Sequence, residues 1–440
     1  MIQTRPKKQP ERALLIGLEQ EGVSKWDLAD SMEELRELAS SAGAEVVDTV
    51  TQKLPKPTAP FYIGKGKAEA IKDCAQREQV TSVIFNDELS PAQGRNLENL
   101  LSRKVLDRTQ LILDIFAQRA RSREGRLQIE LAQLQYLLPR LTRMWNHLSR
   151  QTGGIGTRGP GETQLEVDRR VQERIARLER DLEGVRKVRN VQRQGRKRNQ
   201  WPVAAVVGYT NAGKSTLLNL MTGADVLAQD KLFATLDPTT RSFTLPNKQR
   251  VLLTDTVGFL RKLPHTLIES FKATLEEVSD ADILLHVVDL SHPRVDEQMA
   301  AVDAVIKELD AFGKQTLIVF NKIDLLENPD LSHVYRQRFP GSVAISAKTR
   351  QGINDFVEAL QGALAAWRLR SQFRVPVMES NLIAEIHRVG HVLDLRYDAD
   401  FAVITAHVPP HLQQKLERFS EEFSALASGE RRRHTVGSGR

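Results

Sequence analysis

The chain has 440 residues, 40% of them hydrophobic and 27% charged, a composition that excludes collagen-like and wholly disordered proteins. At roughly 100–200 residues per domain, this length predicts several domains rather than one hydrophobic core. The apolar runs are far shorter than the roughly 20 residues that cross a bilayer, so we expect no stable membrane insertion.

The charge and cysteine content indicate the compartment. Lys and Arg outnumber Asp and Glu by 63 to 56, which is a modest excess. The single cysteine, Cys74, can form neither an internal disulfide nor a multi-cysteine zinc site. The basic first ten residues are not followed by an apolar segment, so no export signal is visible. We therefore expect a cytoplasmic protein.

Residues 1–125 alternate short β-branched runs with helical stretches. Strands are expected at Ala13–Leu18, Glu45–Thr51 and Ser82–Phe85, and a helix is expected at Lys65–Glu78. This alternation predicts an N-terminal α/β domain with a mostly parallel sheet.

Residues 126–200 predict an antiparallel helical hairpin followed by a linker. Apolar residues spaced by three and four run from Leu127 to Leu148 and again from Val167 to Val185, which is typical of two packed helix faces. The segment 149–161 between them contains five glycines and no acid, so we expect a basic tip that can contact RNA. The predicted RNA contacts are Arg140, Arg143, Arg150 and Arg158.

Residues 201–370 follow a strong βαβ pattern, which predicts a doubly wound α/β domain. Residues 371–440 predict a small α+β appendix with strands at 392–396 and Phe401–Ala406, a helix near Pro410–Phe419 and a loose tail. The strands expected in the larger domain are Val203–Val207, Arg241–Leu245, Arg250–Thr254, Ile283–Val288, Thr316–Phe320 and Val343–Ile345.

A glycine-rich segment lies directly between the first of these strands and a helix that begins at Lys214. Its spacing matches a phosphate-binding loop, in which backbone N–H groups and the helix N-terminus hold phosphate oxygens. Lys214 would reach the β- and γ-phosphates and Ser215 would ligate Mg²⁺. The predicted loop comprises Gly208, Tyr209, Thr210, Asn211, Ala212, Gly213, Lys214, Ser215 and Thr216.

A second motif follows the strand Arg250–Thr254. Asp255 can hold Mg²⁺ through water, and the N–H of Gly258 can face a γ-phosphate. The predicted site residues here are Asp255, Thr256, Val257 and Gly258.

Two later motifs select the base. The carboxylate of Asp324 can accept hydrogen bonds from N1–H and the exocyclic amine of guanine together, whereas adenine presents an acceptor there. The segment Ser346–Lys348 can supply a backbone N–H to guanine O6 and an apolar wall for the ring. Four motifs in this order, each at the end of a strand, predict a P-loop GTPase domain that binds GTP and GDP. The base-binding residues are Asn321, Lys322, Ile323, Asp324, Ser346, Ala347 and Lys348.

A threonine should also cover Mg²⁺ from a segment between the loop and Asp255. Residues 233–240 offer Thr235, Thr239 and Thr240, and periodicity does not choose among them.

With these motifs, the segments 233–241 and 107–170 resemble the HflX family of ribosome-associated GTPases. The resemblance extends over roughly residues 13–367. It implies that Thr235 is the threonine on Mg²⁺ and that Phe233, Ala234, Leu236 and Asp237 lie at the nucleotide. It also implies the large ribosomal subunit and its rRNA as partner, with the hairpin directed toward the peptidyl-transferase region, and a role in splitting or rescuing stalled ribosomes. The segment 371–440 resembles an extension present in only some members.

Two residues bear on catalysis. Phe259 stands where many GTPases have a water-orienting glutamine, so we expect slow intrinsic hydrolysis and a group supplied by the ribosome. Asn211 either coordinates K⁺ beside the phosphates, as in a subset of P-loop GTPases, or stabilises its own loop. The residues expected to act in hydrolysis are Lys214, Thr235, Gly258 and Asn211.

Three other functions remain open from the sequence. A ribosome-assembly GTPase would share these motifs. A tRNA-modification GTPase commonly ends in a reactive cysteine motif, and Cys74 is far from the end of this sequence. A non-enzymatic RNA-binding module would bind GTP without turnover. We expect a GTPase that is monomeric when it is off the ribosome.

Overall fold

The computed structural model describes residues 11–22, 25–142, 168–185, 187, 201–223, 233, 239–260, 277–364, 369–398, 400–408 and 410–419. The chain divides into two compact units. The first holds the described residues up to Lys187 together with Phe233 and Leu260, and the second holds the other described residues.

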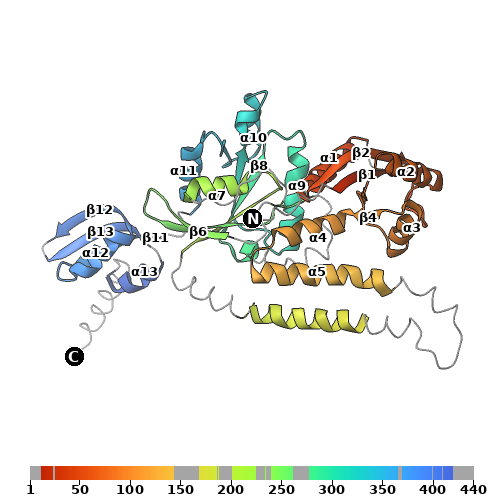
Figure 1. The fold of residues 1–440 in the computed structure, drawn as a ribbon. Coiled ribbons are helices and arrows are strands. Elements are labelled where there is room, and N and C mark those ends of the chain that lie inside the picture. Colours follow the sequence, from red (N-terminus) through yellow and green to blue (C-terminus); the bar gives the residue numbers. More distant parts are fainter. Residues whose placement is uncertain are drawn as a thin grey trace, which may run out of the picture. The chain divides into compact units, whose positions relative to one another are not determined.

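The N-terminal domain is a four-stranded parallel sheet in the order β2-β1-β3-β4, as the alternation predicts (Figure 1). Strand β4 is an addition to the predicted elements. At the start of the third helix the Ser90 hydroxyl accepts a hydrogen bond from the Gln93 N–H, and the Gln93 side-chain oxygen accepts one from the Ser90 N–H. The elements are β1 Glu11–Glu19, α1 Lys25–Ser41, β2 Ala44–Lys53, α2 Lys65–Arg77, β3 Ser82–Phe85, α3 Pro91–Leu101, β4 Lys104–Asp107 and α4 Arg108–Arg119.

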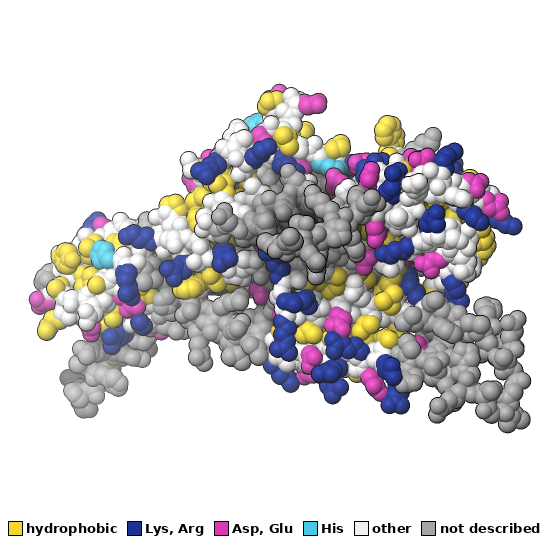
Figure 2. All heavy atoms as spheres, viewed as in Figure 1, with side chains coloured by type: hydrophobic (Ala, Val, Ile, Leu, Met, Phe, Trp, Pro, Cys, Tyr) yellow, Lys and Arg dark blue, Asp and Glu magenta, His cyan; other side chains and the backbone are white. Residues whose placement is uncertain are grey.

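Two long helices follow, α5 (Arg123–Thr142) and the helical residues 168–185, which lie side by side (Figure 1). Leu131 packs with Leu178 and Leu182 in one apolar cluster, so the two predicted seams do face each other. Arg174 holds Glu130 through two hydrogen bonds of 2.7 and 2.9 Å. Figure 2 shows Lys and Arg side chains along this helix pair with acidic side chains among them.

The second unit is built on a six-stranded sheet in the order β10-β9-β8-β5-β7-β6. Strand β6 runs antiparallel to β7 and the other neighbours are parallel, so the predicted doubly wound sheet has an antiparallel edge. Its elements are β5 Val203–Gly208, α7 Lys214–Thr222, β6 Thr239–Thr244, β7 Arg250–Asp255, β8 Ile283–Asp289, α9 Val295–Glu308, β9 Thr316–Asn321, η1 Ile323–Leu325, α10 Asp330–Arg338, β10 Val343–Ala344 and α11 Ile353–Ala363.

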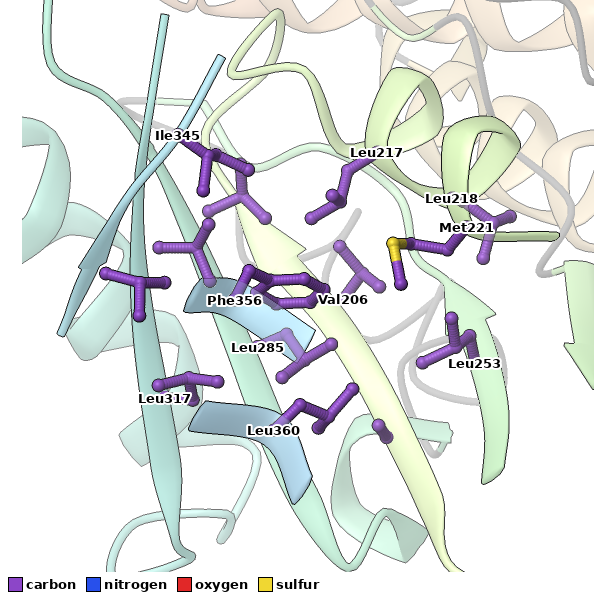
Figure 3. Close-up of a cluster of buried hydrophobic side chains, with 14 of the residues drawn as sticks. Val206, Leu217, Leu218, Met221, Leu253, Leu285, Leu317, Ile345, Phe356 and Leu360 are labelled. Carbon is purple, nitrogen blue, oxygen red and sulfur yellow. The ribbon is translucent and has the colours of Figure 1, made fainter. Parts of the chain in front are cut away.

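The core of this domain lies between the sheet and the helices α7 and α11 (Figure 3). Burial of these side chains fixes the carboxyl ends of β5, β7 and β9, from which the nucleotide motifs extend. The packed side chains labelled in Figure 3 are Val206, Leu217, Leu218, Met221, Leu253, Leu285, Leu317, Ile345, Phe356 and Leu360.

The C-terminal part is a three-stranded antiparallel sheet in the order β11-β13-β12 with helices packed on it. It contains one strand and one helix more than predicted, β11 and α12. The elements are β11 Leu369–Pro376, α12 Ser380–Val389, β12 His391–Asp398, β13 Phe401–Val408, α13 Pro410–Leu416 and η3 Glu417–Phe419.

Within the described ranges, no helix combines the length and the apolar character needed to cross a membrane.

Candidate functional site

The predicted phosphate-binding loop connects β5 to α7 and depends on two glycines. A Cβ on Gly208 would lie 2.2 Å from the Val287 carbonyl oxygen, and one on Gly213 would lie 2.1 Å from Asn321 Nδ2. Gly213 also has a φ of +93°, and Asn211 adopts the left-handed conformation with a φ of +61°. The loop therefore packs against β8 and β9 too closely for side chains at these glycines.

Lys214 is buried at the start of α7, and its ammonium group donates to the carbonyls of Gly208 (3.2 Å) and Tyr209 (2.7 Å). Burial lowers the pKa of Lys214 to about 8, and the charge of Asp255 opposes that shift. A charged ammonium group that is shielded from water interacts more strongly with an anion than an exposed one does, so Lys214 is suited to bind a phosphate.

The Ser215 hydroxyl donates to Asp255 Oδ2 at 2.7 Å, which joins the first turn of α7 to the end of β7. Because the hydroxyl hydrogen points to the carboxylate, the lone pairs of the Ser215 oxygen are available to another partner. A hydroxyl and a carboxylate are the oxygen donors that Mg²⁺ prefers, so the pair fits that ion. P-loop GTPases generally use Mg²⁺.

The segment that follows β7 is joined to the phosphate loop by its backbone. Thr210 N–H donates to the Phe259 carbonyl (2.8 Å), and Phe259 N–H donates to the Gly208 carbonyl (3.1 Å). Phe259 itself is fully buried. These bonds hold Gly258 against the loop, where a Cβ would lie 3.0 Å from Lys214 Nζ.

Asn321 connects the phosphate loop to the last base-binding motif. Its Nδ2 donates to the Ala212 carbonyl (2.8 Å), and its Oδ1 accepts from the Ala347 N–H (3.0 Å). The side chain is buried, so both bonds are shielded from water. Asn321 therefore positions two loops rather than presenting its amide to solvent.

The other residues predicted to bind the base lie around Asn321. Asp324 is exposed in the turn η1, where its carboxylate is accessible. Lys322 forms a 2.7 Å ion pair with Asp289 at the end of β8, a partner that the sequence did not suggest. The Ser346 hydroxyl accepts from the Thr349 N–H (3.0 Å) and so shapes the turn that presents Ala347.

His286 is a buried residue of this domain that sequence reasoning did not single out. It lies on β8 opposite Val207 and Ile318 of the neighbouring strands. Burial, together with the smaller effect of the Lys214 charge, lowers its pKa to about 4. The imidazole is therefore neutral at physiological pH.

The segment expected to cover Mg²⁺ is described at its ends. Phe233 is buried in the first unit with its ring 4.5 Å from that of Phe116, centroid to centroid. Thr239 and Thr240 begin β6, and the Thr240 hydroxyl shares a 3.0 Å hydrogen bond with Thr254, so both belong to the sheet. Ala234, Thr235, Leu236 and Asp237 lie outside the described residues.

Arg140 is the one predicted RNA contact within the described ranges, and it is only 21% exposed in its side chain. It forms a 3.1 Å ion pair with Asp107 and donates to the Leu89 carbonyl at 2.9 Å. The Tyr136 hydroxyl bonds the same carboxylate. This placement favours a structural role for Arg140, because its donors are engaged. Arg143, Arg150 and Arg158 lie outside the described residues.

Comparisons with known proteins agree with this geometry. Three family models match in succession: a GTP-binding GTPase N-terminal domain over residues 29–117, its middle region over 119–196, and a 50S ribosome-binding GTPase domain over 203–322. A GTPase HflX from Caldanaerobacter subterraneus is 48% identical over 410 residues, which cover 93% of this chain and 94% of that protein. The GTPase HflX of Escherichia coli is 46% identical over 363 residues, 82% of this chain and 85% of that protein.

A solved structure of a GTP-binding protein from Sulfolobus solfataricus in complex with GDP is 25% identical, with a TM-score of 0.45, and the match covers 80% of this chain and 98% of that one. The sequence relatives establish the assignment that the motifs and their geometry indicated. The chain belongs to the HflX family of GTPases.

Proposed function

We propose that the protein binds the large ribosomal subunit in its GTP state and splits or rescues stalled ribosomes, with hydrolysis to GDP and phosphate serving its release. The observation that supports this most is the joined set of nucleotide motifs in a chain whose G domain matches the 50S ribosome-binding GTPase model. We place this activity in the cytoplasm, with a monomer as the form that meets the ribosome. The functional parts would be residues 1–125, 126–200, 201–370 and 371–440.

The cycle rests on two segments that the γ-phosphate orders, around Thr235 and around Gly258. A state ordered in this way binds the ribosome more tightly, and loss of the γ-phosphate removes those contacts. The free energy for separating subunits then comes from differential binding to the free large subunit. Splitting assays with purified ribosomes test this: a non-hydrolysable GTP analogue should support one round without recycling, and failure of that round would contradict the cycle.

Hydrolysis should depend on the ribosome. Phe259 offers no hydrogen-bonding side chain for water, so the large subunit would complete the site, an effect on the order of 10³–10⁵ in other GTPases. GTP turnover measured with and without large subunits checks this, with small subunits as the control. Equal rates would remove the proposal.

In the metal site, we propose Ser215 and Thr235 as direct Mg²⁺ ligands and Asp255 as a ligand through water. When bound, the ion neutralises charge on the phosphates. The Ser215–Asp255 hydrogen bond of 2.7 Å supports the roles of these two residues, because it orients the hydroxyl oxygen before an ion arrives. Ser215→Ala should weaken Mg²⁺-dependent GTP binding more than binding without Mg²⁺.

Asn211 would help to hold K⁺ beside the phosphates. Its residue is exposed and has a left-handed backbone conformation, so its side chain is accessible to an ion. Turnover in K⁺ and Na⁺ buffers, for the native chain and Asn211→Ala, tests the idea. A K⁺ effect that survives the substitution would contradict it.

The hairpin tip would contact rRNA through Arg150 and Arg158, with Arg143 close by in sequence. Each lost phosphate contact lowers the salt dependence of binding by about one unit of slope. The double variant Arg150→Ala/Arg158→Ala should therefore bind large subunits with a shallower salt slope. The matched control is Arg169→Ala/Arg180→Ala on the helix itself.

An assembly role is the alternative that these experiments separate. An assembly factor would bind immature large-subunit particles in preference to mature ones and would leave complete ribosomes intact.

A further inference from the structure

The phosphate loop contains a buried hydroxyl that has no hydrogen-bond partner within the described ranges. Thr210 is 7% exposed, and its Oγ1 is shielded from solvent and has no partner among the residues that the structure describes. Buried polar side chains in proteins are almost always hydrogen-bonded, because water lost on burial must be replaced. A hydroxyl left without a partner inside a ligand site is therefore suited to a partner that arrives with the ligand.

The position of Thr210 identifies which part of the ligand it meets. A Cβ built on Gly258 would lie 2.7 Å from Thr210 Cγ2 and 3.0 Å from Lys214 Nζ. The Thr210 methyl group thus adjoins the point where the Gly258 backbone and the Lys214 ammonium come together, and the hydroxyl is attached to the same carbon. In GTPases of this class, those two groups border the γ-phosphate.

The backbone of Thr210 is fixed, so its side chain cannot easily move away from this point. Its N–H donates to the Phe259 carbonyl at 2.8 Å, and Phe259 N–H in turn donates to Gly208 at 3.1 Å. These bonds commit both backbone groups of Phe259 to the loop, and its side chain is apolar. Phe259 consequently has nothing to offer an attacking water.

The neighbouring hydroxyls of the site are already engaged. Ser215 donates to Asp255 at 2.7 Å, and Thr256 donates to the Val206 carbonyl at 2.7 Å, inside the sheet. Thr210 differs from both because its oxygen has no such bond.

We propose that Thr210 is the side chain that positions the attacking water in this GTPase. When GTP binds, rotation about the Thr210 Cα–Cβ bond brings its oxygen to the attacking water, from which it accepts a hydrogen bond. Its O–H group donates a hydrogen bond to a γ-phosphate oxygen and keeps its proton. The water oxygen then bonds to the γ-phosphorus, and the bond to the β–γ bridging oxygen breaks with its electron pair remaining on GDP. The water proton passes to the released phosphate, and the threonine ends unchanged. This role concerns hydrolysis itself and holds with or without a ribosomal partner.

The test compares Thr210→Val, which keeps the shape and removes the hydroxyl, with Thr210→Ser, which keeps the hydroxyl. Single-turnover GTP hydrolysis by the full chain should slow about 10- to 100-fold in Thr210→Val, the effect of one hydrogen bond to a charged group. Thr210→Ser should stay within about threefold of the native rate, and GDP affinity should change less than about threefold in both. Thr222→Val is the control, since that hydroxyl bonds the Leu218 carbonyl within α7.

Two results would overturn the proposal: a native hydrolysis rate in Thr210→Val, or an equally slow rate in Thr210→Ser, which would assign the effect to packing. If Thr210→Val binds GDP poorly, Thr210→Ser and Thr210→Ala form a second pair of similar size that differs by the hydroxyl. The ratio of rates with and without large subunits separates this role from the ribosomal one. Large subunits should raise the rate by the same factor in Thr210→Val as in the native chain. If they raise neither rate, that result counts against the ribosomal proposal alone.

Discussion

Removing the Asn321 side chain should disconnect the phosphate loop from the base-binding loop. Asn321→Ala deletes a 2.8 Å bond to the Ala212 carbonyl and a 3.0 Å bond from the Ala347 N–H, both buried. A buried backbone group that loses its partner costs about 1–3 kcal/mol, so the two together amount to roughly 2–6 kcal/mol. Since about 1.4 kcal/mol is tenfold in affinity, even the lower figure predicts a loss of GDP affinity of about 30-fold.

Fluorescent-GDP titration and thermal unfolding of the full chain measure the two consequences. Asn328→Ala, which removes one exposed cap of the Asp330 N–H, is the matched control and should change neither by much. Asn321→Asp should bind as poorly as Asn321→Ala, because it keeps the acceptor for Ala347 but points a second acceptor at the Ala212 carbonyl. Near-native GDP affinity in Asn321→Ala would refute this reasoning.

Three further perturbations test separate parts of the structure. Gly258→Ala places a Cβ 2.7 Å from Thr210 Cγ2 and 3.0 Å from Lys214 Nζ. In a single-turnover assay GTP hydrolysis should therefore fall by about 100-fold, while GDP affinity should change little. Unchanged hydrolysis would contradict the close approach. His286 has a pKa of about 4 in the folded chain, below its unfolded value, so the unfolded chain takes up the proton first. The free energy of unfolding should therefore fall as the pH drops from about 6.5 to 4, by up to about 1.4 kcal/mol per pH unit. In urea titrations His286→Gln should flatten this dependence, and an unaltered slope would show that other groups cause it. Arg140→Ala should lower the free energy of unfolding by about 1.5–3 kcal/mol, because a buried carboxylate loses a charged partner; if the variant is fully stable and loses affinity for large subunits, its role is in RNA binding.

Much of the fold was predictable because local patterns and burial agree. The parallel N-terminal sheet follows from short β-branched runs that alternate with amphipathic helices. The helix pair follows from its seams, which meet at Leu131, Leu178 and Leu182. In both cases the spacing of the apolar residues identifies the side chains that are buried.

The elements that were missed have weaker or misread signals. Strand β4 has four residues, of which only Val105 and Leu106 are apolar, whereas β3, of the same length, is apolar in three of its four. In β11, Phe373 and Val375 alternate with charged and polar residues, and in α12 Leu382, Ile383 and Ile386 have helical spacing, so both signals were present.

The antiparallel edge of the G domain had a local signal too. Only five residues separate Thr244 from Arg250, which is too short for a parallel crossover and sufficient for a hairpin.

The positions of the predicted site residues in the fold could be read from the sequence, but their contacts could not. Sequence spacing placed Lys214, Asp255 and Asp324 at strand ends of one sheet, as the structure has them. The ion pair of Lys322 with Asp289 depends on how two loops approach each other, which no spacing encodes. The role proposed for Thr210 likewise rests on a hydroxyl that has no partner among the described residues, which no sequence pattern encodes.

Nucleotide selectivity tests the central claim most directly, because the account requires Asp324 to recognise the base and Lys214 the phosphates. Competition calorimetry should show GTP and GDP displacing ATP and ADP, and not the reverse. Asp324→Asn should weaken GTP and favour xanthosine triphosphate, whose O2 accepts from an amide where guanine has a donor. Adenosine nucleotides that bind as tightly as guanosine nucleotides, or an Asp324→Asn variant with native GTP affinity, would contradict the account.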